Sequence, residues 1–144
     1  MIALTRAFGW HRPQSTPCGQ PVPIAEAHAM LELSRTPGIS QSELARAIGL
    51  RKSTVSRIVG NLERRGWVDR RRSSEDRRVA ELVLTDEGLR ASAQIGKARA
   101  ARMEAVLDAI PPSDRDAVVR ALDVLVDATH RANRTPSRSS EDRE

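Results

Sequence analysis

The sequence predicts a mainly α-helical fold with a small β-wing: a winged helix-turn-helix plus a helical dimerisation region. Three observations predict this fold class. An apolar stripe with helical spacing runs from residue 55 to residue 62, two short β-compatible segments follow at 67–72 and 79–84, and a long alanine-rich helical pattern covers 86–110. Only three aromatic residues are present in 144, so we expect an aliphatic core, as in helical bundles.

The first part of the chain is interrupted by prolines. Residues 1–12 can form one short helix, on which Leu4 and Phe8 are apolar. The prolines between residues 13 and 23 each remove a backbone N–H donor and favour extended geometry, so this stretch is predicted to be non-helical. A helix is expected from Ile24 to about Ser34.

A tight pair of helices is predicted next. Ser40 followed by Glu43 is a capping-box pattern, which places the start of a helix at Ser40. Gly49 stands where a residue with positive φ would end that helix and turn the chain. The second helix then has an apolar stripe for packing on a small core, formed by Val55, Ile58, Val59 and Leu62.

The opposite face of the second helix is polar and basic. Ser and Asn side chains can hydrogen-bond base edges, and an Arg can bind guanine through two hydrogen bonds. The alternative is an ordinary solvated helix face, and the pattern of this face alone does not separate the two. The face consists of Ser53, Arg57, Gly60, Asn61 and Arg64.

A basic hairpin is predicted after Gly66. Residues 67–72 and 79–84 are β-compatible, and 73–76 supply turn residues. Between residues 46 and 78 there are 11 Lys and Arg against 4 Asp and Glu, so this segment carries +7 of a chain whose net charge is +5. Such a concentration indicates a phosphate-rich partner. Five arginines flank the turn: Arg70, Arg71, Arg72, Arg77 and Arg78.

Five short motifs resemble the multiple antibiotic resistance regulator (MarR) family of winged helix-turn-helix proteins. They are SQSELA at 40–45, KSTVSR at 52–57, LERRG at 62–66, DRR at 76–78 and LTDEG at 84–88. The resemblance covers about residues 24 to 132. It implies that Arg77 or Arg78 enters a minor groove, that Asp76 supports the wing arginines, and that Arg72 contributes to DNA binding. It also implies that the major groove is contacted by Ser53, Thr54, Arg57, Asn61 and Arg64.

The end of the chain is expected to form a dimer interface. Apolar residues recur at heptad-like spacing from Leu89 to Ile110, Pro111-Pro112 ends that helix, and a last helix starts at Ser113 or Asp114. Wide apolar stripes beside a small domain favour packing on a twin over a monomer that folds back on itself. The predicted dimerisation residues are Leu4, Phe8, Val118, Leu122 and Leu125.

Cys18 and the histidines suggest other chemistry that the sequence supports less well. A thiol activated by a neighbouring base could sense oxidants; the alternative is an incidental cysteine in a Pro-rich loop. The histidines lack the spacing of a metal site, and His28 is read as a core or pocket residue beside Ile24 and Leu31. We expect no metal, no cofactor and no enzymatic activity, since no catalytic motif is present.

These predictions combine into one hypothesis about function. The chain is expected to be a cytoplasmic homodimeric repressor, without a membrane span, that binds a palindromic site on double-stranded DNA and is released by a small-molecule effector. The alternatives are a redox-sensing regulator acting through Cys18, and a winged-helix protein-interaction module without operator recognition. Four regions are expected: a short helix and Pro-rich segment at 1–23, the DNA-binding domain at 24–85, the helical dimerisation region at 86–132, and a disordered tail at 133–144.

Overall fold

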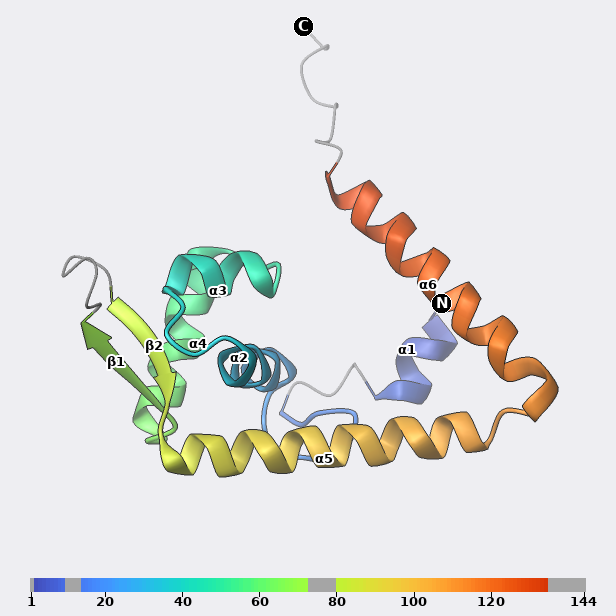
Figure 1. The fold of residues 1–144 in the computed structure, drawn as a ribbon, viewed down its shortest axis with the longest axis horizontal. Coiled ribbons are helices and arrows are strands. Elements are labelled where there is room, and N and C mark those ends of the chain that lie inside the picture. Colours follow the sequence, from blue (N-terminus) through green and yellow to red (C-terminus); the bar gives the residue numbers. More distant parts are fainter. Residues whose placement is uncertain (1, 10–13, 73–79, 135–144) are drawn as a thin grey trace, which may run out of the picture. The chain divides into compact units, whose positions relative to one another are not determined.

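The computed structural model describes residues 2–9, 14–72 and 80–134. The chain divides into two units, Met1–Met103 and Glu104–Glu144. The described residues are mostly helical with one antiparallel two-stranded sheet (Figure 1), which confirms the predicted fold class. The elements are α1 (Ile2–Phe8), α2 (Ile24–Arg35), α3 (Gln41–Ala47), α4 (Lys52–Arg64), β1 (Val68–Arg72), β2 (Ala80–Leu84), α5 (Asp86–Asp108) and α6 (Pro112–Arg134).

The core of the first unit is aliphatic, as predicted. α2, α3, α4 and β2 each contribute side chains to it that are almost completely buried. Burying a side chain of this size stabilises the fold by roughly 1.5–3 kcal/mol relative to leaving it exposed. The largest of these side chains are Met30, Leu33, Leu44, Leu62 and Leu82.

The predicted capping box starts α3. The Ser40 hydroxyl accepts a hydrogen bond from the Glu43 amide at 3.2 Å, and the Ser40 amide donates to the Glu43 carboxylate at 2.7 Å. Gly49 has a φ of 67°, a conformation that glycine adopts without steric cost, and the Leu50 amide then donates to the Ala45 carbonyl at 3.0 Å. This turn brings the start of α4 directly after α3.

The hairpin is also confirmed, and it holds the start of α3. β1 and β2 pair antiparallel with Val68 opposite Leu84 and Arg72 opposite Ala80. On the other edge of β2, the Leu82 amide donates to the Ile39 carbonyl at 3.0 Å. The segment that leads into α3 is therefore attached to the sheet. The predicted turn residues and Asp76, Arg77 and Arg78 lie outside the described residues.

α5 contacts α2 and the Trp67 backbone through one narrow face. Its buried residues are Gly88, Ser92 and Ile95, and the Ser92 hydroxyl donates to the Met30 carbonyl at 3.3 Å. Leu89, at the start of the heptad-like pattern, is 47% exposed. The stripe that packs inside the first unit is thus different from the apolar stripe singled out in the sequence.

The turn between α5 and α6 shifts the predicted boundaries slightly. α5 ends at Asp108, and α6 begins at Pro112, before Ser113, because a proline at the first helical position needs no N–H partner. The Arg115 side chain closes the turn: its Nε donates to the Ile110 carbonyl at 3.2 Å. α6 ends at Arg134 and so includes the first two residues of the predicted tail. No described helix combines the length and apolar character that crossing a membrane requires.

Candidate nucleic-acid interface

The helix α4 has one buried face and one polar face, as predicted. Its apolar stripe from Val55 to Leu62 is at most 5% exposed, which fixes the rotation of the helix about its axis. On the other side Ser53, Arg57 and Arg64 are exposed, and Thr54 is half-buried. The structure therefore brings the predicted DNA-contacting residues of α4 onto one accessible strip, and Asn61 is the member of the strip with a different environment.

Arg70 has a partner inside the fold. Arg70 pairs with the buried Leu82 across the two strands, so both side chains lie on the same face of the sheet. Its Nε donates to the Glu63 carboxylate of α4 at 2.7 Å, and its Nη2 lies 3.4 Å from the other carboxylate oxygen. Arg70, one of the five arginines predicted to flank the turn, therefore has its charge paired with Glu63 inside the fold.

Arg71 and Arg72 are both exposed on β1. Arg72 lies on the same face of the sheet as Arg70, and Arg71 lies on the other face. Their positive charges are therefore accessible to an anion.

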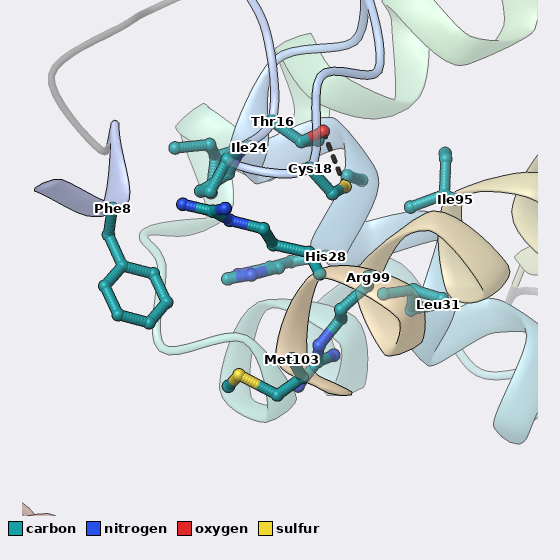
Figure 2. Close-up of a pocket in the computed structure, with 12 residues that line it drawn as sticks. Phe8, Thr16, Cys18, Ile24, His28, Leu31, Ile95, Arg99 and Met103 are labelled. Carbon is teal, nitrogen blue, oxygen red and sulfur yellow. Dashed lines mark hydrogen bonds between the residues drawn. The ribbon is translucent and has the colours of Figure 1, made fainter. Parts of the chain in front are cut away.

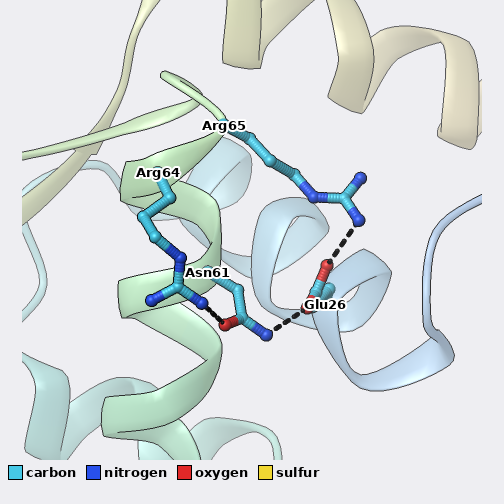
Figure 3. A network of polar contacts seen from close by, with 4 residues as sticks. All are labelled: Glu26, Asn61, Arg64 and Arg65. Carbon is cyan, nitrogen blue, oxygen red and sulfur yellow. Dashed lines mark hydrogen bonds and ion pairs between the residues drawn. The ribbon is translucent and has the colours of Figure 1, made fainter.

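Asn61 takes part in a polar network between α2 and α4 (Figure 3). Its Nδ2 donates to the Glu26 carboxylate at 2.8 Å, and its Oδ1 accepts a hydrogen bond from Arg64 Nη2. The second Glu26 oxygen lies 3.8 Å from Arg65 Nη2, and the Arg65 guanidinium lies over the Trp67 ring at 5.1 Å from its centroid. Glu26 is only 4% exposed.

The start of α5 is tied to the turn that leaves α4. The Thr85 hydroxyl donates to the Gly66 carbonyl at 2.7 Å and accepts from the Gly88 amide at 3.0 Å, so Thr85 caps α5 as predicted. The Thr85 amide also donates to the Trp67 carbonyl at 3.1 Å. A Cβ on Gly88 would lie 2.0 Å from that same carbonyl oxygen, so only glycine fits there.

A cavity of about 260 Å³ lies within the first unit, between α1, the segment before α2, α2 and α5 (Figure 2). Phe8, Ile24, Leu31 and Ile95 are among its apolar walls. Its lining also includes three basic side chains, His28, Arg99 and Arg102. Apolar walls with a few convergent polar groups are typical of small-molecule sites. Phe8, predicted at the dimer interface, lines this cavity.

His28 is a pocket residue, one of the two roles predicted for it. Partial burial lowers the pKa of the His28 imidazole, and the positive charge of Arg99 lowers it further. Both effects disfavour the charged ring. The imidazole is consequently neutral at neutral pH and available to donate or accept a hydrogen bond inside the cavity.

Cys18 also lines the cavity. Its thiol is half-buried and lies 2.9 Å from the Thr16 hydroxyl, which in turn accepts from the Gln20 amide at 3.0 Å. His11 lies outside the described residues. Within the described ranges, no three His, Cys, Asp or Glu side chains gather in a way that could hold a metal ion.

The apolar residues assigned to dimerisation are largely accessible. Leu4 is 39% exposed on α1, and on α6 Leu122 and Leu125 are 48% and 46% exposed, while Val118 is half-buried. α6 in addition exposes Val119, Val124 and Val126. Among the described residues of its own unit, nothing covers this apolar surface of α6.

Sequence reasoning missed Glu26, Glu63 and Gly88. Glu26 is an acidic residue among apolar neighbours of a helix, which is itself a signal, because an acidic side chain is rarely buried without a partner. Glu63 and Gly88 fall inside the family motifs, yet nothing local indicates that one pairs with a strand arginine and the other touches a backbone carbonyl.

The fold and this strip define a winged helix-turn-helix with an exposed recognition helix. The MarR family model matches residues 20–79. The transcriptional repressor MprA of Escherichia coli (strain K12) is 43% identical over 58 residues, which cover 40% of this chain and 33% of that protein. The structure of FabT of Streptococcus pneumoniae in complex with DNA matches with a TM-score of 0.72 at 25% identity. The match covers 77% of this chain and 78% of the FabT chain.

A third similar structure is the transcriptional repressor CouR bound to a 23-mer DNA duplex, with 30% identity and a TM-score of 0.66. The match covers 87% of this chain and 85% of that one. Over residues 20–79 the chain is similar to the MarR family; by their names, MprA and CouR are transcriptional repressors, and FabT was solved in complex with DNA. The matched segments span between a third and a half of the first curated relatives, MprA and those that follow it.

Proposed function

We propose that this chain is a transcriptional repressor that binds double-stranded DNA through α4 and the β1–β2 wing. The observation that carries the proposal is the exposed polar strip of α4, held outward by the buried stripe on its other side; the exposed Arg71 and Arg72 of β1 add positive charge. The likeness to FabT in complex with DNA and to CouR bound to a DNA duplex supports it.

The residues of α4 and the wing divide into two roles. Ser53, Thr54 and Arg57 hydrogen-bond base edges in the major groove and so select the sequence. Arg64 and Arg72 neutralise phosphates, which supplies affinity but little sequence choice. The family resemblance implies that Arg77 or Arg78, with Asp76 as support, enters the neighbouring minor groove; these three residues lie outside the described part of the chain.

The repressor acts as a homodimer on a palindromic operator. The accessible apolar side chains of α6 are not covered by the described residues of its own unit, and a second copy offers a matching surface. Two α4 helices in successive major grooves are then about 34 Å apart, which requires two half-sites in inverted order.

Selection of bound duplexes from a random pool tests both statements. We expect a palindrome with half-sites about one helical turn apart, and an affinity that falls with salt at a slope of about −0.9 per phosphate neutralised. Arg57→Ala should weaken binding to the selected duplex by about 1–3 kcal/mol more than binding to random DNA. Arg90→Ala, an equal loss of charge on exposed α5, is the control. A protein-interaction module would instead bind every duplex weakly and alike.

A small organic anion releases the repressor from its operator by binding in the cavity. The apolar walls suit a ring or chain, and His28, Arg99 and Arg102 suit a carboxylate. A carboxylate near His28 would oppose the effects that lower its pKa, so binding takes up a proton. Release requires that the anion bind the DNA-free form more tightly than the DNA-bound form.

Calorimetry with benzoate and with its uncharged analogue benzamide tests this effector class. Benzoate should bind more tightly than benzamide, more tightly as the pH falls through the pKa of His28, and more weakly to Arg99→Met. Lys97→Met, on the same helix but outside the cavity lining, is the matched control. Equal binding of benzoate and benzamide, or no binding of either, would remove the anion from the proposal while leaving the DNA function intact.

A further inference from the structure

Glu26 is a buried carboxylate that no part of the proposed mechanism uses. It lies in the first turn of α2, is 4% exposed, and its neighbours in the helix are the buried Ala27, Ala29 and Met30. One of its oxygens accepts from Asn61, and the other has no hydrogen-bond partner among the described residues and lies 3.8 Å from Arg65. A buried carboxylate is costly unless it is paired, so its contacts with α4 call for a role.

The chemistry of its neighbours fixes the orientation of the Asn61 amide. A carboxylate can only accept hydrogen bonds, and a guanidinium can only donate them. Glu26 therefore requires the NH₂ group of Asn61, and Arg64 requires its carbonyl oxygen (Figure 3). The reverse orientation would lose both bonds, so a flipped amide is excluded.

This orientation leaves Asn61 poorly suited to read a base. Binding adenine requires both the NH₂ group and the carbonyl oxygen of the amide at once, and each already makes one hydrogen bond in the protein, which fixes the direction of its remaining donor and lone pair. Arg64, in contrast, is exposed, and only one of its guanidinium nitrogens is engaged by Asn61. The remaining donors of Arg64 stay available to DNA.

We propose that Glu26 and Asn61 are positioning residues for Arg64, holding its guanidinium ready for DNA through two hydrogen bonds in series. This inference rests on the proposed DNA-binding function and assigns to Asn61 a role other than the base contact expected from the family resemblance. Ordering a long side chain before binding lowers the entropy lost on complex formation. α2 thereby contributes to DNA affinity without touching DNA.

A double-mutant cycle tests this relay, the series of two hydrogen bonds that runs from Glu26 through Asn61 to Arg64. Glu26→Leu should weaken binding to the selected duplex about 5- to 20-fold in the natural background and less than twofold in the Arg64→Ala background, because the relay then has nothing to position. Glu26→Gln keeps an oxygen that accepts from Asn61 and should restore binding to within about threefold of the natural protein. A merely structural role of Glu26 would weaken both backgrounds by the same factor.

Asn61→Ala provides a second variant in case Glu26→Leu does not fold, which circular dichroism would reveal. If the relay is real, Asn61→Ala should bind DNA about as weakly as Glu26→Leu does. In the Arg64→Ala background, Asn61→Ala should likewise weaken binding by less than twofold. Equal losses in both backgrounds, or natural affinity in Glu26→Leu, would overturn the inference, since the second result means that Arg64 binds DNA equally well without the Glu26 contact.

The failure of the proposed function gives a different result. If the natural protein binds no duplex more tightly than random DNA and Arg57→Ala leaves the DNA affinity unchanged, the proposed DNA-binding function is wrong. If the natural protein selects a sequence and Arg64→Ala weakens binding while Glu26→Leu does not, only the relay is wrong.

Discussion

Replacing Gly88 with alanine tests how the wing is attached to α5. A Cβ at this position would lie 2.0 Å from the Trp67 carbonyl oxygen and 2.9 Å from its carbonyl carbon. An ordinary carbon–oxygen contact is about 3.3 Å, so the two backbones must separate by more than about 1 Å. The carbonyl oxygen concerned accepts the Thr85 amide at 3.1 Å, and this hydrogen bond would lengthen.

The magnitude follows from two opposing effects. Overpacking costs about 1–3 kcal/mol, and a clash between two backbones falls at the upper end because neither can rotate away. Alanine recovers up to about 1 kcal/mol of helix propensity. We therefore expect Gly88→Ala to lower the free energy of unfolding by about 2 kcal/mol, which corresponds to a fall in Tm of roughly 5–10 °C.

Urea and thermal unfolding followed by far-UV circular dichroism measure the effect. Gly96→Ala is the matched control on the same helix, since its Cβ would lie 3.8 Å from the Leu31 Cδ2 atom, an ordinary contact. That variant should be as stable as the natural protein or more stable. If Gly88→Ala proves as stable as Gly96→Ala, the close approach of α5 to Trp67 is refuted.

Three further predictions concern α3, α4 and the cavity. Gly60→Ala should raise Tm, because its Cβ would meet nothing within 4 Å, yet weaken DNA binding if the polar strip of α4 approaches a groove; unchanged affinity would contradict that approach. The Ser40 hydrogen bonds lower the pKa of the exposed Glu43 carboxyl, so their stabilisation is present above its ordinary pKa and is lost as the pH falls through the lowered value. The larger contribution to this lowered pKa comes from the Ser40 amide, which Ser40→Ala retains; the variant removes the smaller side-chain contribution and should raise the pKa in an NMR titration. Arg99→Met should likewise raise the pKa of His28, whereas Lys97→Met should not. Because the pKa of His28 is lower in the folded state than in the unfolded state, the free energy of unfolding should fall as the pH drops below the ordinary histidine pKa.

The local features of the fold were predictable because their causes lie within a few residues of sequence. The Ser40–Glu43 capping box spans one turn, the positive φ of Gly49 follows from the position of the glycine, and the stripe from Val55 to Leu62 repeats with the period of a helix. The hairpin followed from alternation and turn residues. The basic excess between residues 46 and 78 likewise needed no structure to be counted.

The predicted site was incomplete where the partners are far apart in sequence. Arg70 looked like one more arginine for an anion, and only the packing of β1 on α4 gives it Glu63. Asn61 looked like a base reader, and only the packing of α2 on α4 places Glu26, 35 residues away, beside its amide.

The sequence by itself therefore determined the helices, the hairpin, the aliphatic core and the concentration of positive charge, because periodicity, turn chemistry and composition are local or additive properties. Only the tertiary structure decided which charges are already compensated, that Gly88 must have no side chain, and that His28, Arg99 and Arg102 share one cavity. Those facts depend on which faces of distant helices and strands come into contact, and the pattern of residues along the sequence does not say how far apart these elements are in the folded protein.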